Sequence, residues 1–224
     1  DLSSKAGMPD KFRLKALKGG RNNKVFCIDY SNGANALLKA YFKHPYDRRN
    51  RLKTEYAFIN FAWKNKIRCL PKPLAADFHN NLGLYEFIDG KKMSSYEIDA
   101  KKISQALEFF IKLNKYKNTK EAKKLATASD SCFSIKDHIK HVEKRVEKLK
   151  KIKDNPDNHK AKTFISNELL RAWGKSIKHT KILIAKYGLN INKTISYEEN
   201  CISPSDFGFH NALEKSNKLY FIDF

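Results

Sequence analysis

Three oxygen-bearing side chains occur close together near the end of the sequence. Asp206 is followed at the fifth position by Asn211, and a turn and an apolar run then lead to Asp223. Phosphoryl transfer uses side chains of these kinds: one carboxylate orients the attacking hydroxyl, and an amide oxygen and a second carboxylate hold the Mg²⁺ that bridges the phosphates. Residues 218–222 predict a short buried strand that presents Asp223 at its end.

A possible phosphate-binding turn precedes a predicted hairpin in the first part of the chain. Residues 25–30 and 34–42 are strand-like, and Ser31-Asn32-Gly33 between them predicts a tight turn. Glycine has no Cβ, so the preceding glycine pair, Gly19 and Gly20, could bring backbone N–H groups close to phosphate oxygens. Considered alone, the pair is more typical of an ordinary hairpin bend.

Lys39 lies in the middle of the second predicted strand, which is otherwise apolar. A buried ammonium is costly unless it is paired, so a carboxylate from the next element is expected beside it. Residues 49–67 predict a helix, and Glu55 lies in its early turns. Considered alone, Glu55 is more typical of a helix-surface acid. Together with the other motifs, it is favoured as the partner of Lys39.

These motifs resemble the aminoglycoside phosphotransferase and choline kinase group, which are relatives of the protein kinases. The resemblance rests on the D-x-x-x-x-N pattern from Asp206 to Asn211 and on the I-D-F run that contains Asp223. In that family an H-[GS]-D triplet opens the catalytic loop; here Pro204 takes the histidine position, and Ser205 and Asp206 match. The matching segments, residues 19–90 and 203–224, also occur in the expected order.

The resemblance implies an α+β, two-lobed, protein-kinase-like fold. Residues 1–90 would form the N-terminal nucleotide-binding lobe, an antiparallel sheet plus a helix, with the hinge at 86–90. Residues 91–224 would form a mainly helical C-terminal lobe that carries the catalytic loop. In the family further helices follow the I-D-F segment, so the chain is expected to be truncated at its C-terminus, as a shortened form or a natural fragment.

The resemblance also implies a role for each motif residue. Asp206 would be the catalytic residue that orients and deprotonates an acceptor hydroxyl, and Asn211 and Asp223 would be the Mg²⁺ ligands. Lys39 would bind the α- and β-phosphates of ATP, and Glu55 would hold Lys39. Backbone groups of the hinge would bind the adenine edge. The implied nucleotide-binding residues are Gly19, Gly20, Asn22, Asn23, Lys39, Glu55, Glu86 and Ile88.

The middle of the sequence predicts helices. Ser94 and Glu97 have the spacing of a capping box that opens a helix, and Ser134 predicts the cap of a second, amphipathic helix from residue 135. Residues 154–158 break the chain, and a long helix over 162–187 should end at Gly188. We expect these helices to pack within their own domain and not as a coiled coil. His210 is expected to pack within its loop and not to contact substrate.

Composition limits the other possibilities. With 41% hydrophobic residues the chain can bury a core, which argues against wholesale disorder. The sequence has no apolar run that could span a bilayer and no signal-peptide core at its start. The four cysteines are far apart, which favours free thiols in a reducing cytoplasm over disulfides or zinc.

The net charge of +21 raises the possibility of a nucleic-acid or anionic-surface partner. However, the excess is mostly lysine scattered along helical segments, and no RNA-binding or zinc-finger spacing occurs, so a solvated basic surface is favoured and a nucleic-acid partner is disfavoured. The leading hypothesis is an ATP- and Mg²⁺-dependent phosphotransferase whose acceptor is a hydroxyl of a small molecule: an amino sugar, a sugar or an amino alcohol. The alternatives are an inactive kinase-like remnant that binds nucleotide or protein, and a basic binding module.

Overall fold

The computed structural model describes residues 2–17, 23–43, 49–204 and 206–224. Contacts within the chain divide it into two compact units. The first, called the sheet unit here, comprises Asp1–Ala126 and Cys201–Phe224, and the second, called the helical unit, comprises Thr127–Asn200. The predicted lobes, residues 1–90 and 91–224, divide the chain at a different place from these two units, and the lobe boundary stays a prediction.

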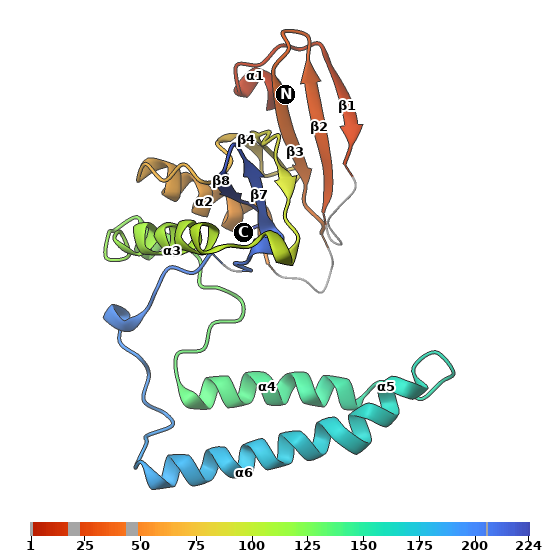
Figure 1. The fold of residues 1–224 in the computed structure, drawn as a ribbon, viewed down its shortest axis with the longest axis vertical. Coiled ribbons are helices and arrows are strands. Elements are labelled where there is room, and N and C mark those ends of the chain that lie inside the picture. The colour runs from red at the N-terminus through yellow and green to blue at the C-terminus, as the bar shows by residue number, and fades with distance from the viewer. Residues whose placement is uncertain (1, 18–22, 44–48, 205) are drawn as a thin grey trace. The chain divides into compact units, whose positions relative to one another are not determined.

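The sheet unit contains all the strands among the described residues (Figure 1). Its strands are β1 (Phe12–Ala16), β2 (Lys24–Tyr30), β3 (Asn35–Ala40), β4 (Pro73–Asp77), β5 (Leu82–Glu86), β6 (Lys91–Lys92), β7 (Ala212–Lys215) and β8 (Lys218–Phe221). Its α-helices are α1 (Leu2–Lys5), α2 (Arg51–Lys64) and α3 (Ala100–Asn114).

Five strands form an antiparallel sheet in the order β1-β2-β3-β5-β4. The predicted hairpin is confirmed as β2 and β3, and Gly33 in its turn has a φ of +82°, a conformation that favours glycine. Strand β5 leads directly into the predicted hinge at 86–90. Strand β1 was not predicted, because all five of its residues are exposed and no core face marks its sequence.

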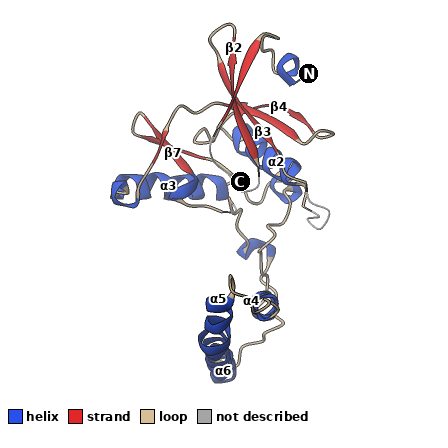
Figure 2. Cartoon of the chain, turned by 90° about the vertical axis from the view of Figure 1, so that its right-hand side faces the viewer, coloured by secondary structure: helices blue, strands red, loops and turns tan. Residues whose placement is uncertain are grey.

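The two faces of β3 contact different cores, because successive side chains of a strand point to opposite sides. Leu37 and Tyr41 belong to the core on the side of α2, where Lys39 contacts Glu55. Figure 2 shows α2 beside β3. Ala36 and Leu38 belong to a second core on the other face, to which residues of the α1 segment contribute. The sheet therefore places Lys39 on the face that α2 covers.

The predicted helix over residues 49–67 is confirmed as α2. It begins after Asn50, whose side chain accepts a hydrogen bond from the Lys53 N–H at 3.0 Å. Its buried face is apolar with a single carboxylate, that of Glu55. The members of this face are Leu52, Glu55, Phe58, Ile59, Phe61 and Ala62. Glu55 therefore lies in the core and not on the helix surface.

The predicted start of the next helix is wrong. The capping box of Ser94 and Glu97 is present, but it opens only one 3₁₀ turn, Ser95–Glu97, and Ile98 after it is extended. Helix α3 begins at Ala100 instead, and the side chain of its cap, Asp99, accepts the Lys102 N–H at 2.8 Å. Two caps follow each other here, and the sequence does not show which of them continues into a helix.

The second sheet is built around a tight hairpin. Its order is β6-β7-β8, and the predicted strand over residues 218–222 is confirmed as β8. Ser216 and Asn217 join β7 to β8 with φ values of +50° and +61°, and a type I′ turn needs positive φ at both of these positions. The backbone N–H of Phe221 also donates to the Cys69 carbonyl at 2.8 Å, which ties β8 to the segment after α2.

The helical unit contains α4 (Ile135–Lys150), α5 (His159–Phe164) and α6 (Leu170–Lys186). Ser134 caps α4 as predicted, by accepting the Asp137 N–H at 3.0 Å. The predicted long helix is confirmed as α5 and α6 joined by a π-helical turn, Ile165–Leu169, and Gly188 follows with a φ of +56°. None of the helices in the described ranges is apolar over enough length to cross a membrane.

An aromatic cluster joins α2, α3 and the end of the chain. Phe109 of α3 is 1% exposed and stacks on Phe221 at 4.9 Å between ring centroids, and Phe224 packs on Phe58 of α2 at 4.8 Å. Truncation of a buried phenylalanine leaves a cavity that its neighbours fill only in part. Phe109→Ala is therefore expected to lower the free energy of unfolding by about 3–5 kcal/mol, measured by urea denaturation.

The matched control is Ile103→Ala on the same helix, where the side chain is 55% exposed. We expect this variant to change the free energy of unfolding by less than about 1 kcal/mol. Equal losses for the two variants would contradict the assignment of Phe109 to the core.

Candidate active site

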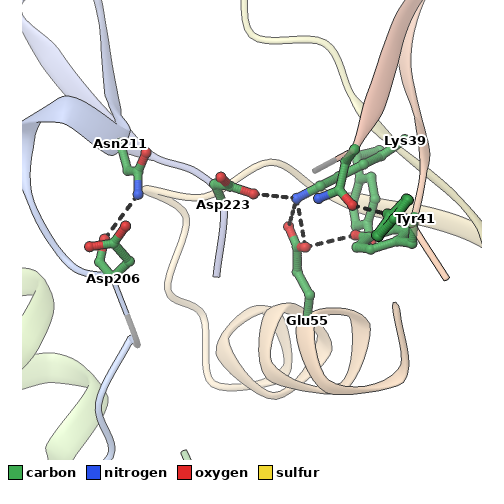
Figure 3. A network of polar contacts seen from close by, with 9 residues as sticks. Lys39, Tyr41, Glu55, Asp206, Asn211 and Asp223 are labelled. Carbon is green, nitrogen blue, oxygen red and sulfur yellow. Dashed lines mark hydrogen bonds and ion pairs between the residues drawn. The ribbon is translucent and has the colours of Figure 1, made fainter. Parts of the chain in front are cut away.

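The ammonium of Lys39 contacts two carboxylates from different parts of the sheet unit (Figure 3). Its Nζ lies 3.0 Å from Glu55 Oε1 and 2.7 Å from Glu55 Oε2, and 2.6 Å from Asp223 Oδ1. Lys39 is 6% exposed and Glu55 is 5% exposed. The structure therefore contains the expected pair of Lys39 and Glu55 and adds a contact with Asp223.

The charges of this cluster depend on one another. Burial alone would lower the pKa of Lys39, but the charges of Glu55 and Asp223 and the hydrogen bonds to them outweigh it and raise that pKa above its ordinary value. Burial raises the pKa of Glu55, and the charge of Lys39 opposes that shift. Lys39 is therefore a protonated group held by two carboxylates.

Asp223 follows directly after β8 and Ile222, and its backbone is in the left-handed region with a φ of +64°. Its side chain is 55% exposed although one oxygen contacts the buried Lys39. The Phe224 ring packs on Phe58, and the Phe221 N–H donates to the Cys69 carbonyl. The backbone is therefore held both before and after Asp223. Asp223 is thus fixed at one oxygen and accessible to solvent.

Asn211 lies beside the strand end that carries Asp223. Its carbonyl accepts the Ile222 N–H at 2.8 Å, and its side-chain Nδ2 donates to the Asp206 backbone carbonyl at 3.0 Å. A carbonyl oxygen can only accept, so this bond fixes which end of the Asn211 amide faces Asp206 and leaves Oδ1 at the other end. Figure 3 shows Asp223 between Asn211 and Lys39.

The side chain of Asp206 is 76% exposed, which is more than those of Glu55 and Asp223. The next residue, Phe207, packs on Phe109 at 5.6 Å and on Phe221 at 5.1 Å, so the loop is attached to the core. His210 Nε2 lies 3.4 Å from Asp206 Oδ1. This histidine was expected only to pack, and its spacing of four residues from Asp206 is the sequence signal for the contact.

The predicted nucleotide-binding turn is only partly described. Gly19, Gly20 and Asn22 lie outside the described residues. The side-chain oxygen of Asn23 accepts the Phe42 N–H at 3.2 Å, so this residue ties the end of the turn to the segment after β3.

The predicted hinge residues already use some of their backbone groups. The N–H of Glu86 donates to the Lys72 carbonyl at 2.8 Å, and the carboxylate of Glu86 accepts the Lys72 N–H at 3.0 Å. The carbonyl of Ile88 accepts the Gly90 N–H at 2.9 Å. An adenine edge would therefore have to meet other backbone groups of residues 86–88.

Sequence reasoning missed two tyrosines of this site. The Tyr41 hydroxyl donates to Glu55 Oε2 at 2.8 Å and lies 2.7 Å from the Tyr85 hydroxyl. The signal for Tyr41 was its position two residues after Lys39, which puts both side chains on one face of the strand. Tyr85 gives no such signal, because it comes from another strand.

The geometry can be compared with known proteins. No protein-family model and no curated protein sequence matches the chain. Among solved structures, a Plasmodium vivax ethanolamine kinase matches with a TM-score of 0.59 and 17% identity, over 96% of this chain and 56% of that one. A spectinomycin phosphotransferase in complex with ADP and spectinomycin matches with a TM-score of 0.60 and 13% identity, over 94% of this chain and 62% of that one.

An amicoumacin kinase in complex with AMP-PNP, Ca²⁺ and Ami matches with a TM-score of 0.53 and 14% identity, over 94% of this chain and 57% of that one. The chain thus spans 56–62% of the length of these structures. The fold is that of the kinase-like small-molecule phosphotransferases, in agreement with the resemblance of the motifs.

Proposed function

We propose that the chain acts as an ATP-dependent phosphotransferase that moves the γ-phosphate of ATP to a hydroxyl of a small molecule. The observation that carries this proposal is the position of the Lys39 ammonium between a buried carboxylate, Glu55, and an accessible one, Asp223. Phosphoryl transfer depends mostly on positioning and electrostatic stabilisation, and this cluster offers both. The fold shared with an ethanolamine kinase, a spectinomycin phosphotransferase and an amicoumacin kinase supports the same reaction class.

Lys39 would bind the α- and β-phosphates. Its partner Glu55 is fully enclosed and can keep the ammonium oriented, whereas Asp223 is half exposed and can release it. Nucleotide phosphates would take the place of Asp223 beside the ammonium. Lys39 would thus exchange one anionic partner for another without becoming unpaired in the core.

Asn211 and Asp223 would hold Mg²⁺, and their donor atoms fit this ion. Mg²⁺ prefers oxygen ligands and is usually bound through one or two protein groups together with phosphate oxygens and water. Asp223 offers a carboxylate, and the bond of Asn211 Nδ2 to Asp206 leaves the amide Oδ1 for a cation. When bound, Mg²⁺ would neutralise charge on the phosphates and align them for transfer.

Asp206 would orient the acceptor hydroxyl and accept its proton. A group in this role needs access to substrate, and the Asp206 side chain is 76% exposed on a loop that Phe207 attaches to the core. The acceptor class that we propose is a small alcohol: an amino sugar, a sugar or an amino alcohol. The net charge of +21 disfavours a polycationic acceptor. We place the reaction in the cytoplasm, which supplies ATP.

A thermal-shift titration with ATP and Mg²⁺ tests the proposal. Wild-type protein should show a rise in melting temperature that requires both, because a ligand that binds only the folded state stabilises it by about 2.7 kcal/mol at 100 times its Kd. Asp223→Ala should lose the part of the rise that depends on Mg²⁺. Asp10→Ala, an exposed aspartate of the same unit, should behave as wild type.

Acceptor screening by ATP consumption then distinguishes an active kinase from the alternative functions. Turnover with a small alcohol supports the proposal. A Mg²⁺-dependent shift without turnover for any acceptor supports a nucleotide-binding remnant instead. The absence of a shift at millimolar ATP, together with salt-sensitive binding to DNA or RNA, would contradict the kinase proposal and favour a basic binding module.

A further inference from the structure

Two buried tyrosine hydroxyls extend the polar cluster behind Glu55. Tyr41 is 7% exposed and Tyr85 is 2% exposed, and their hydroxyl oxygens lie 2.7 Å apart. A phenylalanine would fill the same apolar space at either position, and a buried hydroxyl is costly unless it is hydrogen-bonded. The two hydroxyls are therefore not explained by packing.

The direction of the hydrogen bonds follows from the chemistry of the groups. An ionised Glu55 can only accept, so the single proton of the Tyr41 hydroxyl points to Glu55 Oε2, 2.8 Å away. Tyr41 then has no proton left for Tyr85, and Tyr85 must donate to Tyr41. Burial raises the pKa of both tyrosines, so both hydroxyls keep the protons that these two hydrogen bonds require.

The sheet makes room for this chain of hydrogen bonds at Gly83. Gly83 pairs with Lys39 across the β3–β5 ladder, and Tyr85 is two residues further along β5 on the same face. A Cβ at position 83 would lie 2.6 Å from the Tyr85 ring, which is closer than side chains approach one another. The absence of a side chain at Gly83 lets the Tyr85 ring lie back along β5, where its hydroxyl meets Tyr41.

We propose that Tyr41 and Tyr85 are positioning residues of the nucleotide site, whose hydroxyl chain holds the Glu55 carboxylate so that both its oxygens face Lys39. Lys39 itself bonds both oxygens of Glu55, so a rotation of this carboxylate would misdirect the ammonium. The Tyr41 hydroxyl gives Oε2 a second donor besides Lys39. The inference rests on the proposed function, because the phosphates are the ligands that Lys39 is positioned for.

The experiment compares Tyr41→Phe and Tyr85→Phe with wild type by isothermal titration calorimetry, using Mg·AMP-PNP and adenosine as ligands. Tyr41→Phe should weaken Mg·AMP-PNP about tenfold, the usual size for a hydrogen bond to a charged group. Tyr85→Phe should weaken it about threefold, because it acts through one further bond. Both variants should bind adenosine as wild type does, since adenosine has no phosphates for Lys39 to contact.

Two controls separate positioning from stability. Tyr30→Phe removes another buried hydroxyl of the same sheet, which bonds Ser3 Oγ at 3.1 Å, and should lower the melting temperature without changing either affinity. In a Glu55→Gln background, Tyr41→Phe should cause little further loss of Mg·AMP-PNP affinity, because the group that it positions has already been changed.

Each outcome decides between positioning and another explanation. Unchanged Mg·AMP-PNP affinity in Tyr41→Phe, or equal losses for adenosine and Mg·AMP-PNP, would overturn the positioning role while leaving the proposed function intact. Wild-type protein that binds neither ligand would overturn the proposed function and, with it, this inference. If Tyr41→Phe does not fold, Tyr85→Phe takes its place in the comparison of Mg·AMP-PNP with adenosine. Tyr85→Phe leaves the bond between Tyr41 and Glu55 in place, so the buried carboxylate keeps its hydroxyl donor.

Discussion

Lys39→Met is expected to lower the free energy of unfolding by about 3–5 kcal/mol, because it leaves the Glu55 carboxylate buried without its cation. Methionine has nearly the length of lysine, so the loss does not come from a cavity. The side chain of Glu55 is 6% exposed and cannot turn to water for compensation. The same change should also abolish binding of Mg·AMP-PNP, because the phosphates lose their ammonium. Urea denaturation and calorimetric titration measure the two effects.

The double variant Lys39→Met with Glu55→Leu separates stability from binding. Replacing both members of a buried ion pair by apolar residues is often neutral or stabilising. We therefore expect most of the lost stability to return, while nucleotide binding stays absent. Tyr41 can then donate to Tyr85, so its hydroxyl keeps a partner. If Lys39→Met unfolds at the same urea concentration as wild type, the pair is not the buried interaction described above.

Asp206→Asn is expected to reduce kcat by about 10²- to 10⁴-fold, the usual contribution of a positioned general base. Asparagine keeps the shape of the side chain and cannot accept the proton of the acceptor hydroxyl. The affinity for Mg·AMP-PNP should stay within about twofold of wild type, because Asp206 is not among the groups proposed to bind phosphate or metal. Steady-state kinetics with the acceptor found by screening measure kcat, and calorimetry measures the affinity.

The control for this prediction is Asp10→Asn, which changes an exposed aspartate of the same unit and should leave kcat unchanged. A kcat within a factor of a few of wild type in Asp206→Asn would remove Asp206 from the role of base. A parallel loss of nucleotide affinity would instead assign Asp206 to binding.

The pairing of Lys39 with Glu55 could be predicted from a general rule taken together with the other motifs. A lysine inside an apolar strand needs an anionic partner, and Glu55 lies on the next helix. The strand that ends before Asp223 was also predictable from its apolar run. The contact between Lys39 and Asp223 was not predictable from the residues alone, because 184 positions separate them and only the packed fold brings them together.

Other features carried too little local signal. Strand β1 is an edge strand with every residue exposed, so it has no apolar face to detect. Tyr85 joins the site through the pairing of β3 with β5 and through the space beside Gly83, neither of which a single strand reveals. The start of α3 was misplaced because two satisfied caps, at Ser94 and Asp99, follow each other.

The backbone at Asp223 restricts which amino acids could replace it during evolution. At a φ of +64° a β-branched or bulky residue is strained, whereas glycine, asparagine and aspartate are tolerated. For the proposed Mg²⁺ site, glycine offers no oxygen ligand and asparagine no negative charge. Glutamate has the charge but is longer and less suited to this backbone. The backbone conformation and the proposed chemistry therefore each favour aspartate at this position. A functional substitution would have to satisfy both constraints.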